Sequence, residues 1–170
     1  MSSSPAVEIG GRAAPAGYSS VAEECQVLTE GVGLLDRSHV GRLSISGEDG
    51  LDLLNRLSTN KLMDLAPGRG MPTVLTSNKG RIIDVLFVLK RADQLLEVTA
   101  AESRQKVADW IEFYTFAEDV AVRNVTEETS MLALAGHKAA SVLDAVTGVK
   151  VSDLERYDAI EADVGGTEAK

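Results

Sequence analysis

A single carboxylate interrupts the most hydrophobic run of the sequence. Within the stretch IIDVLFVL, residues 82–89, Asp84 is the one residue that is not apolar. In a regular strand Asp84 shares one face with Leu86 and Val88, and the other face is apolar too. An unpaired ionised carboxylate is costly to bury, so it must be hydrogen-bonded, protonated or at the wall of a cavity. A carboxyl in a pocket is a candidate for acid–base chemistry. Alternatively, Asp84 lies near the start of the strand and binds a backbone amide or Arg81.

The stretch LLDRSHV, residues 34–40, brings together Asp36, Ser38 and His39. These are the residue types of a hydrolytic triad, but neighbours in sequence seldom converge in the geometry that a triad needs. A turn held by bonds between side chains and the local backbone is the simpler interpretation. The only other histidine is His137, and there is one cysteine, so no metal site is predicted.

The charge of the chain argues against two classes of partner. Aspartate and glutamate outnumber lysine and arginine 26 to 17, which gives a net charge of −9. Such a chain is not attracted to nucleic acid phosphates or to an anionic membrane. No apolar run reaches the roughly 20 residues of a membrane span, and the amino terminus has no hydrophobic signal core. A cytoplasmic location is therefore expected by default.

Helix and strand patterns alternate in a way that predicts an α+β fold. Residues 1–17 are rich in Ser, Gly, Ala and Pro and are expected to form a flexible arm. Beyond them strands occur in hairpins with helices interspersed, which predicts helices packed on a mostly antiparallel sheet. Helices are expected within 19–31, 46–60, 101–116 and 137–148, and strands within 43–45, 73–90, 95–100, 118–126 and 129–136.

Several stretches together resemble the amino-terminal segment of the glycine-cleavage T-protein (aminomethyltransferase) family. Its hairpin pattern N-x-x-G-x-I-I-D-D is similar to SNKGRIIDV, residues 77–85, and its L-x-G-P-x-A segment is similar to LAGHKA, residues 134–139. The similarity runs from about Gly31 to the end of the chain. A further pattern, D-x-S-H-x-G followed by a strand, a helix and T-N, is matched by Asp36, Ser38, His39, Gly41, Gly47, Thr59 and Asn60.

The resemblance implies a fold of the aminomethyltransferase folate-binding-domain type, with tetrahydrofolate or a derivative as the cofactor. Residues 18–170 would be the amino-terminal portion of that domain. The fold would be incomplete at the carboxyl terminus, because the family continues into a GYTGE-like loop. In the family the second aspartate of the hairpin lies beside the reactive folate nitrogen. Here Asp84 matches the first aspartate and Val85 the second, and a one-residue bulge could turn Asp84 towards the pocket.

The resemblance also implies which residues would contact folate. Asp84 is the candidate catalytic group and a cofactor-binding residue. Val40 and Phe87 would line the pocket wall, and the Thr99 hydroxyl could bind the pterin.

Three functions follow from these patterns. The first is one-carbon transfer to folate by an aminomethyltransferase-like enzyme, with an aminomethyl-carrying lipoyl protein as a partner. The second is a folate-binding accessory protein without transferase activity, acting with iron–sulfur cluster assembly proteins. The third is a truncated structural module without a site. Whether the chain is an enzyme stays open at this point.

Overall fold

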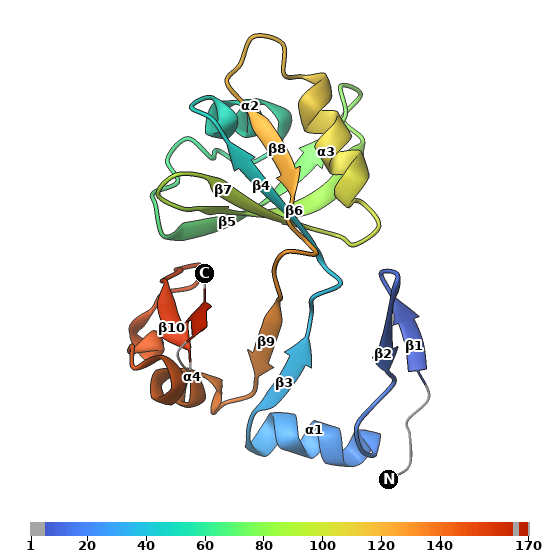
Figure 1. The fold of residues 1–170 in the computed structure, drawn as a ribbon, viewed down its shortest axis with the longest axis vertical. Coiled ribbons are helices and arrows are strands. Elements are labelled where there is room, and N and C mark those ends of the chain that lie inside the picture. The colour runs from blue at the N-terminus through green and yellow to red at the C-terminus, as the bar shows by residue number, and fades with distance from the viewer. Residues whose placement is uncertain (1–5, 165–166, 170) are drawn as a thin grey trace. The chain divides into compact units, whose positions relative to one another are not determined.

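The computed structural model describes residues 6–164 and 167–169, and its contacts divide the chain into two compact units (Figure 1). The assignment of 1–17 as a flexible arm and of 18–170 as one portion of a domain stays a prediction. Unit 1 comprises Met1–His39, Met131–Glu155 and Ile160–Lys170, and unit 2 comprises Val40–Ser130 and Arg156–Ala159.

Unit 2 is built on a five-stranded antiparallel sheet, which confirms the predicted α+β class. The strand order is β5-β6-β7-β4-β8. Across the middle of the sheet, Glu97 pairs with Leu43 on one side and Val88 on the other. The strands are β4 (Gly41–Ser46), β5 (Arg69–Thr76), β6 (Ile82–Lys90), β7 (Leu95–Thr99) and β8 (Ala121–Asn124).

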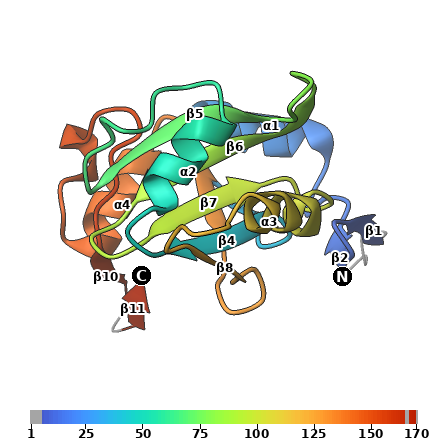
Figure 2. The ribbon, with the colours of Figure 1, turned by 90° about the horizontal axis from the view of Figure 1, so that it is seen from above.

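Two helices cover one face of this sheet (Figure 2). These are α2 (Gly50–Leu57) and α3 (Arg104–Phe113). Val107 and Ile111 lie one helical turn apart, so they point to the same side of α3 and both are fully buried. The resulting core is mostly leucine, isoleucine and valine; its fully buried members include Leu43, Ile45, Leu53, Leu54, Leu62, Leu75, Leu86 and Val88.

The opposite face of the sheet, here called the open face, carries no helix of unit 2. Side chains alternate along a strand, so Val85 and Phe87 of β6 and Val98 of β7 belong to this face. Val85 is 60% exposed. The apolar sequence of β6 is typical of a strand covered on both faces, but Leu86 and Val88, on the helix-covered face, are its only fully buried residues.

Unit 1 has no comparable core. Every buried apolar side chain in the described part of the chain belongs to unit 2. Helix α1 begins with a capping box in which Ser20 and Glu23 bind each other's backbone N–H groups. The elements are β1 (Ala6–Ile9), β2 (Arg12–Pro15), α1 (Val21–Glu30), β3 (Gly33–Asp36), β9 (Leu132–Ala135), α4 (Ala139–Thr147), η1 (Val151–Asp153), β10 (Ala162–Val164) and β11 (Thr167–Ala169).

The strands of unit 1 form three separate two-stranded pairs: β1 with β2, β3 with β9, and β10 with β11. Two of these pairs, β1 with β2 and β3 with β9, are not expected from the sequence. Residues 6–15 fall in the expected arm, and the sequence of β3 shows no alternation of apolar and polar residues. Among the described residues, no helix combines the length and the apolar character that crossing a membrane requires.

Candidate functional site

Asp84 lies half-buried near the start of β6, and its carboxylate accepts three hydrogen bonds. The donors are the backbone N–H of Ala100 at 2.9 Å, the backbone N–H of Val85 at 2.8 Å, and the hydroxyl of Thr99. The carboxylate that interrupts the apolar run is therefore satisfied by fixed donors. Two of these donors come from the end of β7, so Asp84 ties that end to β6.

A β-bulge is present in β6, one residue before Asp84. Leu75 pairs with Asp84 while Thr76 pairs with Ile82, which leaves Ile83 as the extra residue. Because the bulge precedes Asp84, it leaves Asp84 on the same face as Leu86. The expectation that a one-residue bulge turns Asp84 to the other face is therefore wrong for this bulge. The exposed side chain at this point of the open face is that of Val85.

Val40 and Thr99 gather at the same end of the sheet as Asp84. Thr99 is buried and pairs with Gly41, so Val40 directly precedes that pair. Val40 is also buried, and its carbonyl accepts a hydrogen bond of 2.7 Å from the guanidinium of Arg42. Three of the four residues expected at the site therefore lie on neighbouring strand ends of β4, β7 and β6.

Phe87, the fourth expected residue, lies on the open face and packs against Tyr157. The two ring centroids are 5.5 Å apart, and the guanidinium of Arg156 lies 4.7 Å above the Tyr157 ring. Tyr157 has a φ of 71°, a strained conformation for a residue with a side chain. Gly70 makes room for Phe87, since a Cβ there would lie 2.2 Å from the ring. Nothing in the sequence around Tyr157 indicates this contact.

Glu97 is a second group that the sequence patterns did not single out. It is fully buried on the helix-covered face, and neither carboxyl oxygen has a hydrogen-bond partner among the described residues. Burial, and to a lesser degree the charge of Asp84, raise the pKa of the Glu97 carboxyl to about 8. Glu97 is therefore protonated at neutral pH. Glu97 lies two residues from both Leu95 and Thr99, so in a strand it shares their face, and this spacing is the sequence signal that it faces the core.

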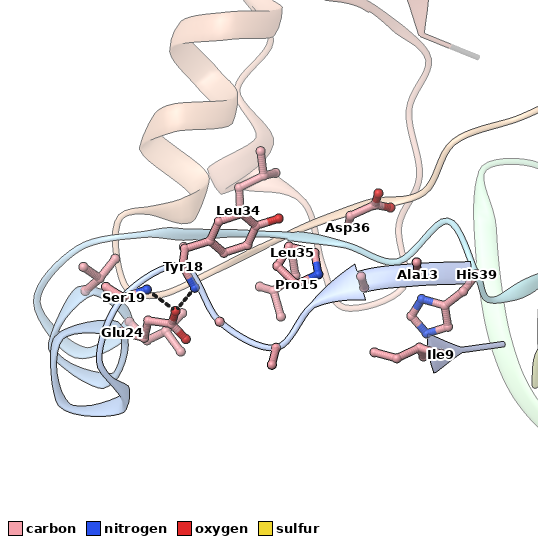
Figure 3. Close-up of a pocket in the computed structure, with 16 residues that line it drawn as sticks. Ile9, Ala13, Pro15, Tyr18, Ser19, Glu24, Leu34, Leu35, Asp36 and His39 are labelled. Carbon is pink, nitrogen blue, oxygen red and sulfur yellow. Dashed lines mark hydrogen bonds between the residues drawn. The ribbon is translucent and has the colours of Figure 1, made fainter. Parts of the chain in front are cut away.

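A cavity lies within unit 1, and Figure 3 shows its lining. Its volume is about 790 Å³. One wall is fixed by Glu24, whose carboxylate accepts the backbone N–H groups of Tyr18 and Ser19. The lining is mostly apolar and consists of Ile9, Ala13, Ala14, Pro15, Ala16, Gly17, Tyr18, Ser19, Glu24, Val27, Leu28, Gly33, Leu34, Leu35, Asp36 and His39.

The triad-like residues at this cavity form a local turn, as the sequence indicated. The backbone N–H of Ser38 donates to the Asp36 carboxylate at 2.8 Å, and the Ser38 hydroxyl accepts the N–H of Met131 at 3.1 Å. The side chains of Asp36 and His39 are not turned towards each other (Figure 3). Within the described ranges, no three His, Cys, Asp or Glu side chains converge as metal ligands would.

Comparisons with known proteins relate the chain to one family. The family model of the GCVT N-terminal domain matches residues 4–170. The aminomethyltransferase of Bacillus subtilis (strain 168) is 33% identical over 165 residues, which cover 96% of this chain and 45% of that protein. The aminomethyltransferase of Staphylococcus carnosus (strain TM300) is 34% identical over 154 residues, which cover 89% and 42%. The chain thus spans less than half the length of these relatives.

A solved structure has the same fold. The crystal structure of glycine cleavage system aminomethyltransferase T from Bartonella henselae superposes with a TM-score of 0.84 at 23% sequence identity. The matched region covers 95% of this chain and 44% of that one. At this level of identity the likeness supports the fold alone, and it confirms the predicted fold type.

Proposed function

The chain belongs to the family of the GCVT N-terminal domain, and on that basis we propose that it forms part of a tetrahydrofolate site used in one-carbon transfer. The relatives named above are aminomethyltransferases, and one of them is a component of a glycine cleavage system. The proposed partners are folate and a lipoyl protein that carries the aminomethyl group.

The arrangement of Asp84 is the observation that carries this proposal. A carboxylate has about four acceptor positions, and three of those of Asp84 are filled by fixed donors. The remaining position can accept a hydrogen bond from an amine of the ligand. Because the other bonds hold the group still, it needs little reorganisation when charge develops nearby.

The proposed role of Asp84 is to orient the folate amine and to stabilise the positive charge that it carries during transfer of the carbon unit. Val40 and Phe87 are proposed to contact the flat pterin ring. Phe87 and Asp84 lie on opposite faces of β6, so the proposal requires the ligand to reach Asp84 and the Thr99 hydroxyl oxygen around the end of the sheet. The aromatic pair of Phe87 and Tyr157 provides a broad apolar surface of the kind that suits a planar ring.

A second function is favoured by Val85. This residue occupies the position of the family's second aspartate, and it is apolar and 60% exposed on the open face. A site without a carboxylate there could hold folate without transferring a carbon unit. The chain would then act as an accessory protein, with iron–sulfur cluster assembly as the proposed setting, and Asp84 would serve only to join β6 to β7.

Calorimetric titration with tetrahydrofolate tests the folate site. We expect binding to the unmodified chain, and at least tenfold weaker binding to Asp84→Asn. The control is Asp93→Asn, the same change on an exposed aspartate in the turn at the other end of β6. Absence of heat at high ligand concentration would overturn both folate functions and leave the structural module. Unchanged affinity in Asp84→Asn would assign Asp84 a purely structural role.

A second assay separates transfer from accessory binding. The chain is mixed with tetrahydrofolate and a lipoyl protein loaded with the aminomethyl group, and the folate product is followed by chromatography. Product formation that is lost in Asp84→Asn supports the transferase. Folate binding without product formation supports the accessory function.

A further inference from the structure

Aromatic residues are concentrated at the end of α3. Four of the chain's seven lie between residues 110 and 116. We call Trp110, Phe113, Tyr114 and Phe116 the aromatic patch. Three of its rings are in mutual contact: centroid distances are 6.2 Å from Trp110 to Phe113 and 5.1 Å from Tyr114 to each of them. The patch belongs to unit 2 and is formed by the last turn of α3 and the residues that follow it; α3 is one of the two helices that cover the sheet (Figure 2).

Two rings of the aromatic patch face solvent. Phe113 is 64% exposed and Phe116 is 81% exposed. Single exposed apolar side chains are common, but an exposed ring that contacts two others, as Phe113 does, is typical of surfaces that bind another molecule. Trp110 is partly buried and packs against the core, so the patch is anchored to the rigid part of unit 2.

The loop that carries Phe116 is held in place by Glu118. Its carboxylate accepts the backbone N–H groups of Phe116 at 2.9 Å and Ala117 at 3.1 Å. It also forms an ion pair of 2.9 Å with Arg56 of α2. The ion pair and these backbone bonds lower the pKa of Glu118 to about 2. The backbone that carries the exposed ring is therefore held in place, which reduces the entropy lost on binding.

A hollow adjoins the aromatic patch. Its volume is about 540 Å³, and it is lined by Glu102, Gln105, Lys106, Asp109, Trp110 and Phe113. The indole Nε1–H of Trp110 is buried and has no acceptor among the residues that the structure describes. Because this N–H has no exposed surface, a ligand in the hollow would contact the indole ring and not its N–H.

The charge around the hollow is negative. Glu102 and Asp109 outnumber Lys106 in the lining, and exposed Glu112 lies one turn further along α3. The whole chain also carries a net charge of −9. This charge opposes a second copy of the chain and an anionic lipid surface, and it favours a cationic ligand.

We propose that the aromatic patch and its hollow dock a cationic peptide segment of another protein. An apolar side chain of that segment lies against Phe113 and Phe116. A Lys or Arg side chain pairs with the carboxylates of Glu102 and Asp109 and contacts the rings through cation–π attraction. This surface is independent of the proposed folate site, so either can fail without the other.

Trp110 is the only tryptophan, so its fluorescence reports directly on the aromatic patch. The probe is a tryptophan-free synthetic peptide in which lysine alternates with pairs of leucines, and the control peptide has glutamate in place of lysine. We expect the lysine peptide to shift the Trp110 emission in a saturable manner that weakens as salt is raised. The glutamate peptide should leave the emission unchanged.

Variants locate the binding. Phe116→Ala and Asp109→Asn should each weaken binding of the lysine peptide at least fivefold, because one loses the exposed ring and the other a carboxylate. Leu132→Ala is the matched control, because it truncates an apolar side chain that is 61% exposed and lies in unit 1. This variant should bind the lysine peptide like the unmodified chain. All three positions are exposed, so these variants should keep the fold.

Several results would overturn the proposal. They are no emission shift with the lysine peptide, equal binding by Phe116→Ala and the unmodified chain, and equal binding of the two peptides. Concentration-dependent dimers that Phe116→Ala dissociates would identify a second copy as the occupant. A shift of the Trp110 emission on addition of phosphatidylglycerol vesicles, without any peptide, would identify a lipid surface instead.

Discussion

Replacing Glu97 with glutamine should make the protein's stability less dependent on pH. The folded state holds a proton on Glu97 up to a pKa of about 8, whereas an unfolded chain releases it near 4.5. Between these values the unfolded state binds fewer protons, so the free energy of unfolding falls as pH rises. Below 4.5 both states are protonated, and above 8 the loss is complete.

The size of this effect follows from the pKa difference. Each pH unit inside the window lowers the free energy of unfolding by about 1.4 kcal/mol. Between about pH 5 and pH 8 the Glu97 carboxyl should therefore remove roughly 4 kcal/mol, a large part of the 5–15 kcal/mol that is typical for a domain of about this size. Glutamine has nearly the same shape and cannot ionise, so Glu97→Gln should lose this slope.

Urea unfolding at a series of pH values measures the difference, with Trp110 fluorescence as the signal for unit 2. The free energies of Glu97→Gln and of the unmodified chain should differ little at pH 5 and diverge in favour of the variant towards pH 8, by roughly 4 kcal/mol. Glu48→Gln, on an exposed glutamate, should run parallel to the unmodified chain. If Glu97→Gln also ran parallel, the carboxyl would be ionised in the folded state and the reasoning would be refuted.

Three further changes test contacts around the sheet and in unit 1. Thr99→Val should lower the free energy of unfolding by roughly 1–3 kcal/mol, because Asp84 loses its hydroxyl donor; urea unfolding measures it. Gly70→Ala should cost roughly 1–3 kcal/mol, since the new methyl group would meet the Phe87 ring, and Phe87→Leu should relieve part of that cost in a double-mutant cycle. Equal costs in both backgrounds would contradict the contact. Ser20→Ala should destabilise α1 by about 1 kcal/mol and speed hydrogen exchange of its first-turn amides, whereas an unchanged rate would argue against the capping box.

Local signals in the sequence were sufficient for most of unit 2. The hairpin turn at 77–80 follows from Asn78 and Gly80, and α3 follows from the spacing of Val107 and Ile111. These features depend on residues within one turn of each other, so composition and periodicity capture them. Strand β3 was missed because its leucines are both exposed and its partner β9 lies about 100 residues away.

At the candidate site, the sequence indicates that Asp84 needs hydrogen-bond partners but not which residues supply them. A carboxylate in an apolar strand must find donors, and Asp84 does. That the donors are Thr99 and Ala100 depends on the register of β6 with β7, which no local pattern specifies. The same register buries Glu97. The contact of Phe87 with Tyr157 joins residues 70 positions apart and depends on an unusual backbone conformation at Tyr157.

The hydrogen bonds that join the two ends of the segment 40–130 have a consequence for folding during synthesis on the ribosome. The backbone of Arg42 binds Val125 and Thr126, so the segment 40–130 is joined at its two ends and holds the whole sheet. It can fold as soon as it has emerged, while the residues after 130 are still in the exit tunnel or being added. The segment 156–159 arrives later and adds the Tyr157 ring to Phe87 on the open face. A nascent chain therefore has a folded sheet before it has a finished ligand surface, and the last contacts to form are those nearest the proposed pterin.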